Sequence, residues 1–351
     1  MDKNIIVPNE PFSLVGNNKI KIRGRHTVSG GYLAFDWSNS GIAFNFHGTG
    51  FMLSLGEYKA DQPAYVKVIV DGGARRQRFA VSNGNEKIII EGLNDRRHRV
   101  EILKVTEGSA KLLFGELTLF GNEAALNLPP FNRPRRIEYI GDSITCGYGV
   151  LGRSVDPGYL TYQQDGTYSY AYLTSEALAA DGRYICISGK GIVCNCEGNR
   201  EDVKAGQYYE YQTYEGGVCD DGWQADVVVI NIGTNDCGGP AGKEEFTSAG
   251  LDLISKVRAR YPGSEIIWMY GMMSEFYLET IRDMIRTVSE TDKKVHMLYV
   301  ESVFGRENEI GANGHPNVHA DIRASSLLVK KIVSVTGWRR VSTLERENEN
   351  E

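Results

Sequence analysis

The chain has 351 residues and a formal net charge of −6, with 41% hydrophobic and 24% charged residues. This length allows two domains of ordinary size, and the composition is typical of a globular protein. The negative charge argues against nucleic acid or an anionic membrane as a partner. The chain begins without a signal peptide, and no apolar run approaches transmembrane length. Because six cysteines are too few for a disulfide scaffold, we expect a cytoplasmic protein with reduced thiols, or a secreted one if a leader is removed.

Residues 1–121 are predicted to form a β-sandwich domain. Short runs rich in β-branched and aromatic residues, such as "GIAFNFHGTGFMLSLGE" and "AYVKVIVDGG", alternate with turn sequences such as "SNGN". Val66, Val68 and Val70 recur at every second position, as one face of a half-buried strand requires. No long segment of this region has the helical period, which favours two packed sheets.

Residues 122–136 contain three of the ten prolines and are predicted to be a linker. From residue 137 to residue 340, strand-like runs alternate with helical ones, among them a predicted helix over 167–182. Such alternation predicts βαβ crossovers and a central parallel sheet covered by helices. The last residues, 341–351, have the composition of a polar tail.

Three predicted strands of this second domain end in residues suited to acyl transfer. "GDS" follows the first strand, "SGKG" the second and "GTND" the third. Because the carboxyl ends of parallel strands meet at one edge of a sheet, these loops are expected to lie together. Ser143 would supply a nucleophilic hydroxyl. Its own N–H, the Gly189 N–H and the Asn235 amide would supply donors to an oxyanion.

His315 is the best candidate for the base that such a serine needs. It lies in the loop "GANGHPNVHAD", just before the last predicted helix, whose start Pro316 and Asn317 would suit. This position places the imidazole outside the helix, at the same sheet edge as Ser143.

The blocks "GDSITCGYG", "SGKG", "GTND" and "GHPN" together resemble the four blocks of the SGNH, or GDSL-type, hydrolases. The matching residues are Ser143, Gly189, Asn235 and His315, with Gly191 as the alternative in the second block. A preceding β-sandwich makes the whole chain most similar to carbohydrate esterase family 2. This resemblance implies a jelly-roll first domain and the removal of O-acetyl groups from plant polysaccharides such as xylan or mannan.

One departure from the resembled superfamily concerns the residue that orients the histidine. An aspartate usually lies two or three residues before it, where this chain has Asn313 and Ala312. An amide cannot stabilise an imidazolium by charge, and losing the acid costs a serine protease roughly 10⁴ in rate. The enzyme is therefore either weak or a Ser–His dyad in which a backbone carbonyl holds Nδ1–H, and we favour the dyad.

A long aromatic segment between residues 195 and 223 offers candidates for a sugar-binding wall, with packing inside the protein as the alternative. These candidates are Tyr208, Tyr209, Tyr211, Tyr214 and Trp223. We expect no cofactor and no metal, because the Cys-x-Cys at Cys194 and Cys196 is tighter than structural zinc spacing. The expected partner is an acetylated carbohydrate, and the oligomeric state is not predicted. The rival functions are an SGNH lipase or thioesterase, and a carbohydrate-binding protein with a vestigial hydrolase domain.

Overall fold

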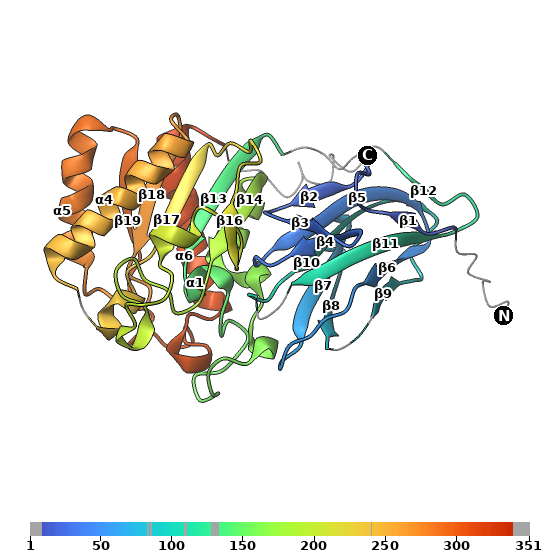
Figure 1. Ribbon diagram of the computed structural model, residues 1–351, viewed down its shortest axis with the longest axis horizontal. Helices are drawn as coiled ribbons and strands as arrows, with labels where there is room; N and C mark the ends of the chain where they lie inside the picture. Colours follow the sequence, from blue (N-terminus) through green and yellow to red (C-terminus); the bar gives the residue numbers. More distant parts are fainter. Residues whose placement is uncertain are drawn as a thin grey trace. The chain divides into compact units, whose positions relative to one another are not determined.

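The computed structural model describes residues 9–82, 84, 86–108, 111–127, 133–239 and 241–339 (Figure 1). The chain divides into two compact units, one ending at Asn132 and the other running from Arg133 to Val341. The predicted tail over 341–351 and the prolines at 129 and 130 lie outside the described residues.

The first unit consists of two antiparallel sheets. One has the order β3-β4-β11-β6-β9 with β1 beside β11, and the other the order β12-β5-β10-β7-β8 with β2 beside β5. The strands are β1 (Phe12–Ser13), β2 (Lys21–Arg23), β3 (Thr27–Ser29), β4 (Tyr32–Phe35), β5 (Ser40–Gly48), β6 (Gly50–Leu55), β7 (Ala64–Val70), β8 (Arg75–Val81), β9 (Lys87–Ile90), β10 (Arg96–Lys104), β11 (Leu112–Phe120) and β12 (Ala125–Leu126).

The core of this unit is one cluster of buried side chains that both sheets supply. Val66, Val68 and Val70 belong to it together with Phe35 and Leu53 from the opposite sheet. The period-2 pattern in β7 thus marks its buried face, and the predicted sandwich is confirmed.

The second unit contains a five-stranded parallel sheet of order β14-β13-β17-β18-β19. Its strands are β13 (Arg135–Gly141), β14 (Ala180–Cys186), β17 (Val227–Asn231), β18 (Glu265–Tyr270) and β19 (Val295–Tyr299), and a separate hairpin joins β15 (Tyr211–Thr213) to β16 (Gly216–Val218). The helices are α1 (Ser143–Cys146), α2 (Tyr170–Ala177), α3 (Ala205–Tyr208), α4 (Lys243–Arg260), α5 (Leu278–Thr291) and α6 (Val318–Thr336). Helix α2 packs against α6, and α4 packs against α5.

The strand order places a topological switch point at the middle of this sheet. From β13 the chain passes to β14 on one side, and from β17 it passes to β18 on the other side. The loops after the neighbouring strands β13 and β17 therefore leave the sheet in opposite directions. Ligand sites of open parallel sheets form at such points. The fold therefore brings the "GDS" and "GTND" loops together.

Two boundaries differ from the expectations or refine them. The helix predicted over 167–182 ends at Ala177, because Ala179 adopts a left-handed φ of 46° and β14 begins at Ala180. The segment predicted as linker, 122–136, contains β12, which pairs with β5, and the first two residues of β13.

Asp321 connects two helices of the second unit. It lies buried on α6 and accepts a hydrogen bond from the N–H of Tyr170, the first residue of α2, at 2.7 Å. Burial raises the pKa of this carboxyl well above its usual range. The protonated form is therefore favoured in the folded state, and its contribution to stability is lost as pH rises above the unfolded pKa of about 3.9.

Asp321→Asn keeps an acceptor oxygen for Tyr170 and removes the ionisation. We expect its free energy of unfolding, relative to wild type, to increase between about pH 4 and pH 8. Urea unfolding at a series of pH values measures this difference. A difference that does not change with pH would show that Asp321 ionises equally easily in both states.

Candidate active site

Ser143 lies directly after β13, at the first position of the short helix α1. Asp142 is the N-cap and accepts from the Ile144 N–H at 3.0 Å, and Gly147 ends the helix in a left-handed conformation. Asp142 therefore fills the capping position, which leaves the Ser143 hydroxyl free of a capping role. The side chain is 4% exposed, so Ser143 occupies a sheltered position at the carboxyl edge of the sheet.

His315 contacts Ser143 across 172 residues of sequence. Its Nε2 lies 2.8 Å from Ser143 Oγ, and its Nδ1 lies 3.1 Å from the backbone carbonyl of Asn313. A carbonyl can only accept, so Nδ1 carries the hydrogen and Nε2 is left to accept from the serine hydroxyl. Asn313 adopts a left-handed φ of 52°, which turns its carbonyl toward the imidazole.

Partial burial lowers the pKa of His315 to about 4, and hydrogen bonds to the backbone of Asn313 and Ala312 oppose this shift only in part. A carboxylate partner would favour the charged form, but a carbonyl carries no charge. The imidazole is therefore neutral at neutral pH, the state that a general base requires.

The backbone N–H groups of Ser143 and Gly189 have no acceptor among the described residues. The N–H of Gly191, the alternative in this loop, already donates to Asn195 Oδ1 at 3.1 Å. Gly189 has a φ of 76°, and a Cβ there would lie 2.9 Å from Cys196 Sγ. Geometry therefore favours Gly189 over Gly191 as a donor.

The Asn235 amide also reaches this edge, but both of its hydrogens have protein acceptors. Nδ2 donates to Asp142 Oδ2 at 3.1 Å and to the Lys190 carbonyl at 3.0 Å. Asp142 thus ties the first block to the third. An oxyanion would have to share or displace one of these two bonds.

Asp236, the next residue, has a role that the sequence did not reveal. Its carboxylate accepts from the N–H groups of Ile192, Val193 and Cys194 at 2.8–3.2 Å. Burial raises its pKa, whereas these three backbone donors lower it. Asp236 therefore fixes the second block against the third, and the only sequence signal for this was its place in "GTND".

Two of the proposed sugar-wall tyrosines support the sheet edge through their hydroxyl groups. Tyr208 is fully buried and donates to the Gly141 carbonyl at 2.7 Å, and Tyr214 donates to the Cys186 carbonyl at 2.8 Å. These carbonyls close β13 and β14. Both hydroxyls therefore hold the strand ends that precede the catalytic loops.

The remaining aromatic candidates are dispersed. Tyr209 is 1% exposed, and Tyr211 is half-buried in the β15–β16 hairpin. Trp223 precedes β17, at the opposite end of the strands from Ser143, and its ring lies 4.3 Å from the Arg183 guanidinium. Tyr209 is thus too buried to line an open wall, and Trp223 lies away from Ser143.

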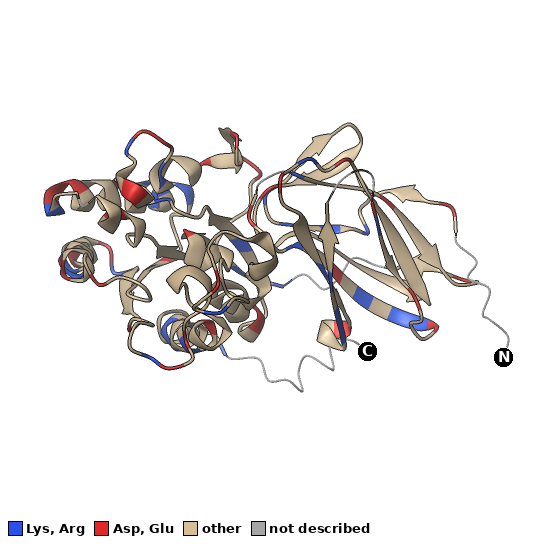
Figure 2. Ribbon diagram, turned by 90° about the horizontal axis from the view of Figure 1, so that it is seen from below, with Lys and Arg blue, Asp and Glu red and all other residues tan. Residues whose placement is uncertain are grey.

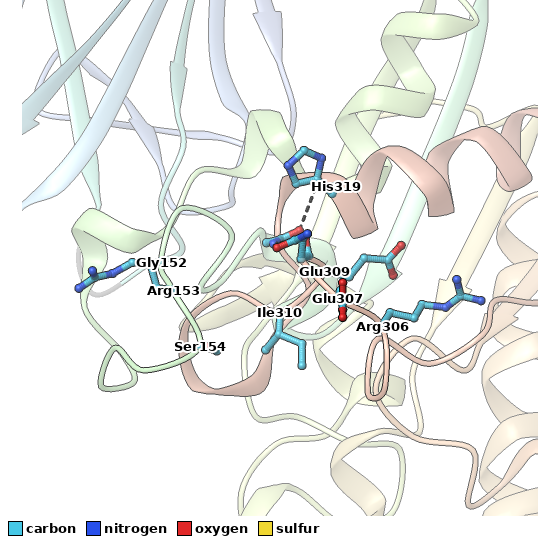
Figure 3. Close-up of a pocket in the computed structure, with 10 residues that line it drawn as sticks. Gly152, Arg153, Ser154, Arg306, Glu307, Glu309, Ile310 and His319 are labelled. Carbon is cyan, nitrogen blue, oxygen red and sulfur yellow. Dashed lines mark hydrogen bonds between the residues drawn. The ribbon is translucent and has the colours of Figure 1, made fainter.

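A polar cavity of about 710 Å³ borders the loop that carries His315 (Figure 3). Its lining includes Gly152, Arg153, Glu309, Ile310 and His319 but neither Ser143 nor His315. Ile310 is its single large apolar side chain, so the cavity offers mainly hydrogen-bonding groups.

The described part of the chain contains neither a disulfide nor a cluster of metal-binding side chains. All six cysteines are free thiols. Within the described ranges, no group of three or more His, Cys, Asp or Glu side chains could hold a metal ion. No described helix is both long and apolar enough to span a membrane.

Comparison with known proteins agrees with this geometry. Residues 22–129 match the carbohydrate esterase 2 N-terminal domain, and residues 139–319 match the GDSL-like lipase/acylhydrolase family. The cellulase/esterase CelE of Acetivibrio thermocellus is 29% identical over 86% of this chain and 38% of its own length. An acetylxylan esterase/glucomannan deacetylase of Cellvibrio japonicus is 30% identical over 41% of this chain and 40% of its own length. The matches thus span about two fifths of these curated relatives.

A solved structure extends the similarity over both units. The family two carbohydrate esterase from Clostridium thermocellum, solved with cellohexaose, has a TM-score of 0.82 and 28% identity. The match covers 91% of this chain and all of that one. The predicted resemblance to family 2 carbohydrate esterases is thereby confirmed. The chain belongs to the GDSL-like lipase/acylhydrolase family and carries a carbohydrate esterase 2 N-terminal domain.

Proposed function

We propose that the protein is a serine esterase that removes O-acetyl groups from acetylated plant polysaccharides or their oligosaccharides, of xylan or mannan type. One observation carries this proposal: Ser143 Oγ lies 2.8 Å from Nε2 of an imidazole whose Nδ1–H is held by a backbone carbonyl. A hydroxyl and a neutral base in this arrangement form an activated nucleophile.

In the proposed reaction, Ser143 Oγ attacks the acetyl carbonyl carbon while His315 Nε2 takes the hydroxyl proton. The N–H groups of Ser143 and Gly189, with the Asn235 amide, stabilise the oxyanion. The resulting imidazolium returns the proton to the departing sugar oxygen, which leaves an acetyl-serine. Water, deprotonated by His315, then releases acetate and restores Ser143.

Three observations support a carbohydrate ester over a long-chain lipid. The curated relatives are named as acetylxylan esterase and glucomannan deacetylase, and the similar solved structure contains cellohexaose. The cavity beside the His315 loop has a polar lining, which suits hydroxyl groups better than an acyl chain. Acidic and basic residues are interspersed over the helices of the hydrolase unit (Figure 2), so their distribution favours neither an anionic nor a cationic substrate.

The function is tested by acetate release from acetylated xylans and mannans, alongside 4-nitrophenyl esters of increasing chain length. We expect acetyl esters to be preferred, and Ser143→Ala to fold normally with kcat lower by about 10⁶, because a nucleophile is lost. A preference for octanoate would indicate a lipase, and saccharide binding without turnover would indicate a vestigial enzyme. Ser143→Ala with a tenth of wild-type activity would require another nucleophile.

We expect the esterase activity to depend on the protonation state of His315. The base must be neutral, and the pKa of His315 is lowered to about 4. We therefore expect kcat/KM to rise with pH only up to about pH 4 and to stay level through neutrality. Acetate release between pH 3.5 and 8, with folding checked by circular dichroism, measures this profile. An inflection near 6.5, the ordinary histidine value, would show that substrate-free His315 is solvated.

The third prediction tests what orients the histidine. If the Asn313 carbonyl does so, Asn313→Gly and Asn313→Ala should each keep kcat within about tenfold of wild type, a change below ~1.4 kcal/mol. His315→Ala should be nearly inactive by comparison. The glycine variant is the matched control, because alanine at a φ of 52° adds backbone strain of about 1–2 kcal/mol. If both variants fall as far as His315→Ala with unchanged melting temperatures, the amide side chain orients the imidazole.

A further inference from the structure

The aromatic residue of the block "CGYG" lies against the catalytic imidazole. The ring centroid of Tyr148 is 4.2 Å from that of His315, with the two planes inclined by 54°. Tyr148 is 5% exposed. It stands between Gly147 and Gly149, whose left-handed φ values of 77° and 68° turn the chain sharply on either side of the ring.

This contact is fixed at both ends. The Tyr148 hydroxyl accepts a hydrogen bond from the Tyr159 N–H. The Gly149 carbonyl accepts from the Ala312 N–H at 3.0 Å, and a Cβ on Gly149 would lie 3.2 Å from the His315 Cβ. The segment 147–149 is therefore joined directly to the loop 312–315, and the ring keeps its position beside the imidazole.

The proposed reaction creates a positive charge on His315, and among the described residues no carboxylate hydrogen-bonds to its ring. The influences on its pKa are burial and hydrogen bonds to the backbone of Asn313 and Ala312. Among the described residues, the side chains that contact the imidazole are the Ser143 hydroxyl and the Tyr148 ring, and neither is a carboxylate. A cation within about 6 Å of an aromatic ring centroid is stabilised by the negative potential of the ring face.

We propose that Tyr148 is a positioning residue that holds His315 toward Ser143 and stabilises the imidazolium through its ring face, in place of the missing carboxylate. This inference rests on the proposed esterase function for its kinetic consequence. Its electrostatic consequence holds for the folded protein whether or not it turns over substrate.

The kinetic test compares Tyr148→Phe with Tyr148→Leu. Phenylalanine keeps the ring and loses the bond to Tyr159, so kcat should stay within about threefold of wild type. Leucine removes the ring, so kcat should fall by roughly 5- to 30-fold with KM nearly unchanged. Equal losses in both variants would assign the effect to the hydroxyl and overturn the proposal, as would a leucine variant with full kcat.

The second readout needs no turnover. In the Ser143→Ala background, the ¹³C-labelled imidazole of His315 is titrated by NMR, with His315→Gln to assign the signal. We expect the leucine variant to titrate at least about half a pH unit below wild type, and the phenylalanine variant to match wild type. A leucine variant that titrates at the same pH or higher would show that the ring only excludes water. If wild type hydrolyses no ester, the proposed function fails, whereas this titration still decides the role of the ring.

Discussion

The hydrogen bond from His315 Nδ1–H to the Asn313 carbonyl is the contact on which the site depends. It fixes the tautomer, and only that tautomer leaves Nε2 free to accept from Ser143. The bond joins residues two apart, so the backbone must turn sharply between them, as the positive φ values of Asn313 and Gly314 allow. The Ala312 N–H then ties this turn to the Gly149 carbonyl. The base is thus oriented by backbone geometry where other members of the superfamily are expected to use a side chain.

A neutral carbonyl has a different chemical consequence from a carboxylate. Burial lowers the pKa of the His315 imidazole to about 4, and the hydrogen bond to the carbonyl offsets this only in part, so the first proton transfer has less driving force. The same shift makes the imidazolium a stronger acid. In the proposed reaction the leaving group is a sugar alkoxide, which is a poor leaving group until it is protonated. A low pKa therefore hinders the attack of Ser143 and assists the departure of the sugar.

The order of strands and helices, and the residues at the strand ends, can be predicted from the sequence. The burial of individual side chains cannot. Ser143 and His315 could be paired because parallel strands bring their carboxyl ends together, whatever the separation along the chain. Strand β8 is hard to predict because "RRQRFAV", on an edge of its sheet, shows little apolar alternation. Tyr208 and Trp223 are aromatic residues of the kind that stack on sugars. Only the fold shows that Tyr208 donates to the Gly141 carbonyl and that Trp223 lies at the far end of β17.

The carboxylates of the first and third blocks serve the proposed oxyanion hole without transferring protons. Asp142 accepts from the Ile144 N–H and the Asn235 amide, and Asp236 accepts from three backbone N–H groups just after the second block. Buried carboxylates need such donors, because an unpaired charge is costly in a low dielectric. Asn235 therefore donates to two acceptors, a carboxyl oxygen of Asp142 and the Lys190 carbonyl. In the proposed reaction, a developing oxyanion shares or displaces one of these two bonds, while the other keeps the amide at the edge of the sheet.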